Sequence, residues 1–211
     1  WYLTKEGQHT MMVIHPQAEF LMGSPVSEAE RYGGSMGKNE IRHRRRIGRT
    51  FAIGAHEVTV SQFQAFQNDH DFNRTFARED NAPANMITWY DAAAYCNWLS
   101  EQEGLPVAYE QVGGKWKLIS PSTTGFRMPS EAEWAWAARY ATDSSPHRFP
   151  WGDSMPPLDG AGNFADEAAA GMVPYHIVGY KDAFRGPAPV GSYASNELGI
   201  HDLTGNVSEW I

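Results

Sequence analysis

Short apolar runs divided by polar turns alternate along this chain with segments whose apolar residues recur at helical spacing. Residues 11–14 and 20–22 are apolar runs on either side of a Pro-containing turn, which predicts two strands in hairpin-like succession. Residues 115–119 form another candidate strand between turn-forming residues. Residues 67–82 are polar and irregular, which predicts a connecting loop. No internal repeat and no low-complexity linker interrupts this succession of short elements.

Three segments carry the signals of a helix start. In each, a Ser or Thr side chain can cap the helix while the residue three positions later bonds back to the cap, which defines a capping box. The pairs are Thr59 with Gln62, Thr88 with Asp91, and Ser130 with Glu133. Apolar residues then recur at helical spacing, so each helix is predicted to bury one face. On the second helix this face includes Cys96, which we interpret as a buried structural thiol.

Two charged groups allow a functional or a structural interpretation. The arginine run within residues 42–49 could contact an anion, but a solvated edge strand is the simpler interpretation. Glu131, Glu133 and Arg139 could form acid–base machinery. Carboxylates in the first turn of a helix are explained more simply by the helix dipole. We therefore favour the structural interpretation for both groups over the functional one.

Composition narrows the class of protein. The chain has 211 residues, of which 42% are hydrophobic and 13% aromatic, as is typical of a globular protein with a sizeable core. Its formal charge of −8 argues against a general nucleic-acid binder. No stretch approaches the roughly 20 apolar residues of a membrane span. The first residue is Trp1 rather than Met, so the localisation stays unknown.

The densest set of candidate ligands lies in residues 198–210. Gly205 and Asn206 predict a turn because both residue types tolerate positive φ at low cost. Asp202 before the turn and Glu209 after it can converge on one point, together with backbone carbonyls of the turn. Hard oxygen ligands of this kind suit Ca²⁺. Spacing alone favours a simpler alternative, an ordinary tight turn with surface carboxylates.

The same stretch resembles a known family signature. Residues 198–210 read LGIHDLTGNVSEW, similar to the GLYDMxGNVxEW signature of the formylglycine-generating enzyme and sulfatase-modifying factor family. Further matches in family order are ITWYDAAAYCNWLSEQEG, GFRMPSEAEWAWAARY and FPWGD. The resemblance runs from about residue 10 to residue 210, so we expect one domain over residues 1–211. It implies an α+β, C-type-lectin-like mixed fold, irregular, with few helices, short antiparallel sheets and much loop.

The resemblance also implies two structural Ca²⁺ sites, built from side-chain and carbonyl oxygens. The first set comprises the side chains of Asn163 and Asp182 and the carbonyls of Phe164 and Phe184. The second set comprises the side chains of Asp202 and Glu209 and the carbonyls of Gly205 and Val207. Amide, carboxylate and carbonyl oxygens together make a suitable set for this ion.

For active members the resemblance implies oxidation of a sulfatase cysteine, within a Cys-x-Pro-x-Arg polypeptide, to formylglycine. That reaction consumes O₂ and uses two cysteines that hold Cu(I), an ion that prefers soft thiolate ligands. In the family these cysteines follow the GNVxEW segment, whereas this chain stops at Ile211 and holds one cysteine, Cys96. We therefore expect Cu only where a further catalytic segment is present.

Two hypotheses stay open. The chain is either a formylglycine-generating oxidoreductase domain that lacks its C-terminal catalytic segment, or a non-catalytic, Ca²⁺-stabilised binding domain on the same fold. The first expects a sulfatase-type polypeptide as partner, and the second expects another protein or ligand. Whether the protein is an enzyme is not decided by the fold alone.

Overall fold

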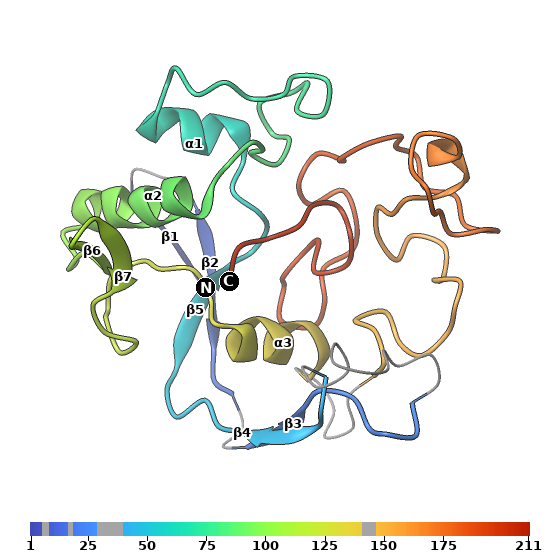
Figure 1. The fold of residues 1–211 in the computed structure, drawn as a ribbon, viewed down its shortest axis with the longest axis horizontal. Helices are drawn as coiled ribbons and strands as arrows, with labels where there is room; N and C mark the ends of the chain where they lie inside the picture. Colours follow the sequence, from blue (N-terminus) through green and yellow to red (C-terminus); the bar gives the residue numbers. More distant parts are fainter. Residues whose placement is uncertain (6–8, 17–18, 29–39, 141–146) are drawn as a thin grey trace.

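The structure is a computed structural model that describes residues 1–5, 9–16, 19–28, 40–140 and 147–211. In Figure 1 the helices and strands gather in the part of the chain before residue 140, while residues 147–211 form a loop-rich region beside them. The predicted succession of short elements separated by much loop is confirmed.

Within the described ranges, seven short strands form three small antiparallel sheets. Their bounds are β1 (Tyr2–Leu3), β2 (Thr10–Ile14), β3 (Phe20–Met22), β4 (His43–Arg45), β5 (Phe51–Gly54), β6 (Tyr109–Val112) and β7 (Lys115–Leu118). The first sheet has the order β1-β2-β5, while β3 pairs with β4 and β6 pairs with β7. The candidate strand at residues 115–119 is thus confirmed as β7.

The prediction that residues 11–14 and 20–22 form a hairpin is wrong. β2 pairs with β5, and β3 pairs with β4, so the two strands belong to different sheets. Both strands nevertheless bury side chains in one core, to which Ile14, Phe20 and Met22 contribute. Periodicity identifies a strand without identifying its partner: β2 lies between β1 and β5, and β3 pairs with β4.

The arginine run coincides with an edge strand, as predicted. β4 belongs to a two-stranded sheet, and Arg44 and Arg45 are exposed. The Arg44 Nη1 atom lies 3.2 Å from Glu19 Oε2. Ion pairs between exposed side chains contribute little to stability, so this pair leaves the edge charged and does little to hold the sheet together.

All three helices begin at the predicted capping boxes. They are α1 (Val60–Phe66), α2 (Trp89–Gln102) and α3 (Glu131–Arg139), and in each box both hydrogen bonds are present. Phe63 of α1 stacks on Tyr95 of α2 with ring centroids 5.3 Å apart, which joins these helices. No helix in the described ranges is long and apolar enough to cross a membrane.

One core cluster ties the loop-rich region to the strands and helices. It contains Ile14 of β2 and Trp136 of α3 together with Ile200 and Leu203, which flank the predicted ligand Asp202. Burial of apolar side chains therefore fixes the segment that leads into the GNVSEW stretch.

Buried polar side chains organise residues 147–211, where the single regular element is the 3₁₀ turn η2 (Glu167–Ala169). Asp166, which is 1% exposed, accepts hydrogen bonds from the Ala168 N–H at 2.8 Å and the Asp182 N–H at 3.0 Å. The hydroxyl of buried Tyr180 donates to the Gly162 carbonyl at 2.6 Å. Backbone groups that would otherwise be unpaired are satisfied by these side chains, which allows an irregular backbone to pack.

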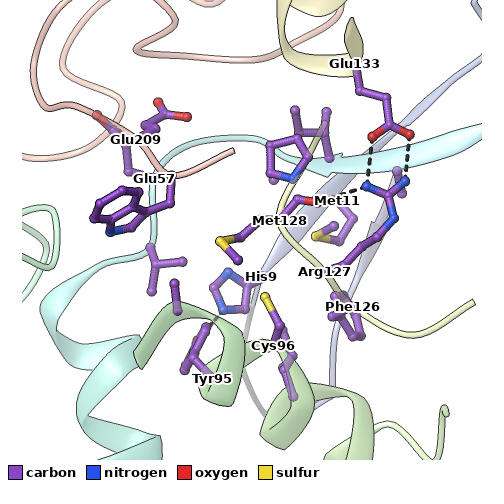
Figure 2. A pocket seen from close by; sticks show the side chains of 18 of the residues that line it. His9, Met11, Glu57, Tyr95, Cys96, Phe126, Arg127, Met128, Glu133 and Glu209 are labelled. Atoms are coloured by element: carbon purple, nitrogen blue, oxygen red, sulfur yellow. Dashed lines mark hydrogen bonds and ion pairs between the residues drawn. The ribbon is translucent and has the colours of Figure 1, made fainter. Parts of the chain in front are cut away.

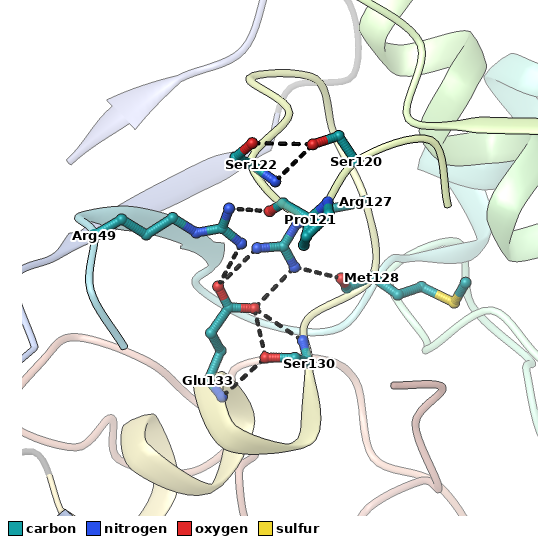
Figure 3. A network of polar contacts seen from close by, with 8 residues as sticks. All are labelled: Arg49, Ser120, Pro121, Ser122, Arg127, Met128, Ser130 and Glu133. Atoms are coloured by element: carbon teal, nitrogen blue, oxygen red, sulfur yellow. Dashed lines mark hydrogen bonds and ion pairs between the residues drawn. The ribbon is translucent and has the colours of Figure 1, made fainter. Parts of the chain in front are cut away.

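Glu133 is the centre of a polar network at the start of α3 (Figure 3). Its carboxylate is buried and accepts from Arg127 at 2.8 and 2.7 Å, and from Arg49 at 3.2 Å. Burial alone would raise the pKa of Glu133, but hydrogen bonds from Arg127 and Ser130 hold it at about 2. The structural interpretation of Glu133 is therefore supported. Its carboxylate pairs with two arginines in addition to capping the start of α3.

Replacing Glu133 tests the importance of that network. Glu133→Gln should lower the free energy of unfolding by about 3 kcal/mol, because it leaves a half-buried and a largely buried guanidinium without their counter-charge. Glu131→Gln is the matched control, since Glu131 lies in the same helical turn but is exposed; its effect should stay within about 0.5 kcal/mol. Equal urea-denaturation midpoints for the two variants would contradict this account.

Candidate functional site

The predicted turn at Gly205 and Asn206 is present and packs against the other predicted site. Both residues have positive φ, 75° and 58°. Gly205 forms a parallel bridge with Asn163, and the Asn206 N–H donates to the Asn163 carbonyl at 2.7 Å. A Cβ atom on residue 205 would lie 2.1 Å from that carbonyl oxygen, so only glycine fits. The two loops that were predicted from separate sequence motifs are therefore in direct contact.

The structure brings together the four residues of the first predicted site. The Asp182 carboxylate accepts from the Phe164 N–H at 2.9 Å and from the Phe184 N–H at 2.8 Å. Asn163 is 5% exposed, and its amide nitrogen donates to the Gly186 carbonyl at 2.8 Å. Since Nδ2 makes this bond, the amide oxygen Oδ1 is left as an acceptor. The Asp182 carboxylate thus connects the segment that carries Asn163 and Phe164 to the segment that carries Phe184.

At the second predicted site, Asp202 carries a buried carboxylate that is only half satisfied. Asp202 is 6% exposed, and its Oδ2 accepts from the Gly191 N–H at 2.6 Å. Its Oδ1 is buried and has no hydrogen-bond partner. A buried unpaired carboxylate oxygen is costly, and a cation in contact with it would remove that cost. The unpaired carboxylate oxygen of Asp202 is therefore a suitable ligand for Ca²⁺.

Glu209, the other carboxylate of the second site, lies on the wall of a cavity. It is exposed to the cavity, and its Oε2 accepts from the Trp134 indole N–H at 2.9 Å. Desolvation by the surrounding wall raises the pKa of Glu209, and the charge of Asp202 raises it further. Val207 lines the same cavity, so the segment after the turn runs along its wall.

Glu57 is a third carboxylate near the second site, and sequence reasoning missed it. Its Oε1 accepts from the Asn206 amide at 2.9 Å, while its Oε2 is buried without a partner. Burial and the charge of Asp202 raise the pKa of Glu57 to about 8. No local pattern marks this residue, because it follows β5 as a single Glu and reaches Asn206 only through the fold.

The side chains do not form a ready-made cluster of charged ligands. In the parts of the chain that the structure describes, no group of three or more His, Cys, Asp or Glu side chains is arranged to hold a metal ion. Each predicted set has at most two carboxylates and relies otherwise on an amide and on backbone carbonyls. Such neutral oxygens are ordinary ligands for Ca²⁺. The proposed sites therefore differ from a cluster of acidic side chains, because most of their ligands are uncharged.

A cavity of about 800 Å³ adjoins the second site (Figure 2). Its wall is mostly apolar and includes β5 and part of α2. Glu57 and Glu209 lie together on one side of the view, and Arg127 with Glu133 lies on the other. Tyr2 near the N-terminus also lines the cavity, so widely separated parts of the chain meet there.

Two titratable residues on the cavity wall have shifted pKa values that keep them neutral near pH 7. His9 is 5% exposed, and its Nε2 lies 2.6 Å from the Tyr95 hydroxyl. Burial, with the nearby His56, lowers the pKa of His9 to about 4. Cys96 was predicted to be buried, but it is half-buried and opens onto the cavity. Desolvation still raises the pKa of the Cys96 thiol to about 12.

Because the thiolate is the reactive form, Cys96 should react slowly with a thiol reagent near pH 7.5. The native rate should increase with pH toward the thiol pKa of about 12, while the urea-unfolded chain should react rapidly at pH 7.5. A stopped-flow labelling experiment measures both rates. Native labelling as fast as that of the unfolded chain would show that the cavity does not suppress the thiolate.

The irregular α+β fold and its paired loops define a class of protein. A family model described as "Sulfatase-modifying factor enzyme 1-like domain" matches residues 3–211. The chain therefore belongs to this family, which confirms the resemblance noted in the sequence.

Curated relatives include several formylglycine-generating enzymes. The chain is 32% identical over 130 residues to the formylglycine-generating enzyme of Thermomonospora curvata, covering 62% of this chain and 33% of that protein. It is 30% identical over 186 residues to chaperone protein LppX of Paenibacillus barcinonensis, and the match covers 76% of this chain and 61% of that protein. It is 28% identical over 134 residues to inactive C-alpha-formylglycine-generating enzyme 2 of Bos taurus, covering 61% and 32%. The chain thus spans less than two thirds of the length of each.

Solved structures agree on the fold. Treponema denticola variable protein 1 superposes with a TM-score of 0.73 at 21% identity, covering 99% of this chain and 74% of that one. PvdO from Pseudomonas aeruginosa superposes with a TM-score of 0.69 at 23% identity, covering 100% and 72%. The fold is therefore the expected C-type-lectin-like mixed fold with few helices, short antiparallel sheets and much loop.

Proposed function

We propose that this chain is a calcium-binding domain of the formylglycine-generating type, and that calcium holds its loop-rich region in order. The observation that carries the proposal is the buried Oδ1 of Asp202, which has no hydrogen-bond partner although Ile200 and Leu203 beside it are packed in the core. An ion at this position would pair that oxygen, and Glu209 is the second carboxylate proposed as a ligand of the same site.

The proposed ligands are those that the family signature implies. At the first site these are the side chains of Asn163 and Asp182 and the carbonyls of Phe164 and Phe184. At the second site they are the side chains of Asp202 and Glu209 and the carbonyls of Gly205 and Val207. Ca²⁺ would supply charge neutralisation and a fixed point for several segments, which is a stabilising role rather than a chemical one.

For the whole protein we propose the family's reaction, oxidation of a cysteine in a sulfatase-type Cys-x-Pro-x-Arg polypeptide to formylglycine. Residues 1–211 contain one cysteine, Cys96, so a two-thiolate Cu(I) site cannot be assembled from them. The raised pKa of that thiol also disfavours a thiolate ligand. Copper would therefore need cysteines other than those in this chain, and the contribution of this domain would be the scaffold and the cavity beside Glu57 and Glu209.

A second candidate is a non-catalytic domain that binds a protein or another ligand on the same calcium-ordered scaffold. The matches to an inactive enzyme and to a chaperone protein support this candidate. An assay with Cu(I), O₂ and a Cys-x-Pro-x-Arg peptide separates the two candidates. The 211-residue chain should form no formylglycine, while formylglycine production by the whole protein would support the enzyme and its failure would support the binding domain.

Calcium binding should be visible in the melting temperature. Binding to the folded state alone adds about 2.7 kcal/mol at a 100-fold excess of ligand over Kd, so a chelator should lower the melting temperature and Ca²⁺ should restore it. Asp202→Ala should abolish most of the response at its site, because it removes a charged ligand. Asn163→Ala should have a smaller effect, because an amide contributes less Coulombic attraction.

Asp69→Ala provides the control for these variants, since Asp69 is exposed and lies in the α1–α2 connection. Its response to chelator and to Ca²⁺ should match that of the unmodified chain. A melting temperature that does not change with either reagent would reject the calcium sites.

A further inference from the structure

Asn206 makes more hydrogen bonds than a turn requires. Its Nδ2 donates to Glu57 Oε1 at 2.9 Å and to the Ala188 carbonyl at 3.3 Å. Its Oδ1 accepts from Asn163 Nδ2 at 2.9 Å and from the Ala188 N–H at 2.8 Å. An asparagine amide offers two donors and two acceptor positions, and all four are used here.

These bonds connect the two proposed calcium sites. Asn206 lies between Gly205 and Val207 of the second site, and it holds the amide of Asn163 of the first. Because the Asn163 amide group is planar, fixing its nitrogen also fixes the direction of its oxygen, the proposed ligand. The close approach of Gly205 to the Asn163 carbonyl joins the same two segments through the backbone.

We propose that Asn206 is a positioning residue that couples the two calcium sites, so that an ion at one site raises the affinity of the other. An ion at the first site would hold Asn163, which would order the Asn206 side chain and thereby the turn that carries the second site. Ordering shared groups once, rather than twice, makes the second binding step more favourable, and the effect is reciprocal. The inference rests on the proposed function, because it requires that both sites bind Ca²⁺.

Asn206 also fixes Glu57, the carboxylate that sequence reasoning missed. With the Asn206 side chain removed, the Oε1 atom of Glu57 would lose the hydrogen bond from Asn206, while its buried Oε2 has no partner in the described structure. The loss would therefore reach the carboxyl group of Glu57 as well as Asn163. This convergence on one amide distinguishes coupling through Asn206 from a general stiffness of the loops.

Isothermal titration with Ca²⁺ tests the coupling without any measurement of activity. In the natural sequence, Asp182→Ala should weaken binding at the second site about five-fold or more, the lower end of typical coupling between sites. In an Asn206→Gly background the same substitution should change the second-site affinity less than two-fold. Glycine keeps the positive φ of residue 206 at no steric cost, so only the side chain is removed.

Asn97→Ala is the matched control. The Asn97 side chain also makes several hydrogen bonds, to the Tyr109 carbonyl at 2.8 Å and from the Ala108 and Tyr109 N–H groups at 2.9 Å, but it lies on α2 away from both loops. In its background the effect of Asp182→Ala should stay at about five-fold or more.

The outcomes separate this inference from the proposed function. Two sites that bind independently in the natural sequence, or coupling that persists in Asn206→Gly, would overturn the coupling while leaving calcium binding intact. The first of these needs no Asn206 variant, so it remains decisive if Asn206→Gly does not fold. A chain that binds no Ca²⁺ would overturn both the coupling and the proposed function.

Discussion

The loop-rich region depends on the contact between Asn163 and Gly205. The backbones approach so closely that a Cβ atom on residue 205 would lie 2.1 Å from the Asn163 carbonyl oxygen. Neither segment belongs to a helix or to a named strand, so this contact and the four bonds of the Asn206 amide replace a regular ladder. Because a polar backbone must be satisfied wherever it is buried, residues 147–211 can pack only with side chains such as Asp166 and Tyr180 inside them. The same requirement brings carboxylate and amide oxygens together in the region where an ion is proposed to bind.

Local features of the fold could be predicted from sequence, because their physics is local. All three capping boxes involve residues three positions apart, and all three are present. The positive φ angles at Gly205 and Asn206 follow from residue type alone. Strand pairing failed as a prediction, since β2 and β3 take partners from residues 43–54 rather than from each other. The periodicity of side chains along one strand does not indicate which distant strand will pair with it.

In the candidate site, too, the residues marked by a local motif could be predicted, and those brought in by the fold could not. Residues of the GNVSEW stretch were found because a family signature marks them, whereas spacing alone favoured an ordinary turn. Glu57 could not be found in this way, since it meets Asn206 from a distant part of the chain. Cys96 illustrates a partial success, because the helix face was assigned correctly, but a cavity opens beside the thiol. Burial still keeps the pKa of that thiol high, so the expectation of an unreactive cysteine stands as a prediction.

Counting the calcium ions bound by the folded chain tests the central claim most directly. Native mass spectrometry of the calcium-loaded chain should show two Ca²⁺ ions per molecule. A double variant, Asp182→Ala with Asp202→Ala, should show none under the same conditions, because one carboxylate ligand is removed from each proposed set. An ion count that is the same for the double variant and the natural sequence would contradict the account, since calcium would then bind elsewhere or not at all.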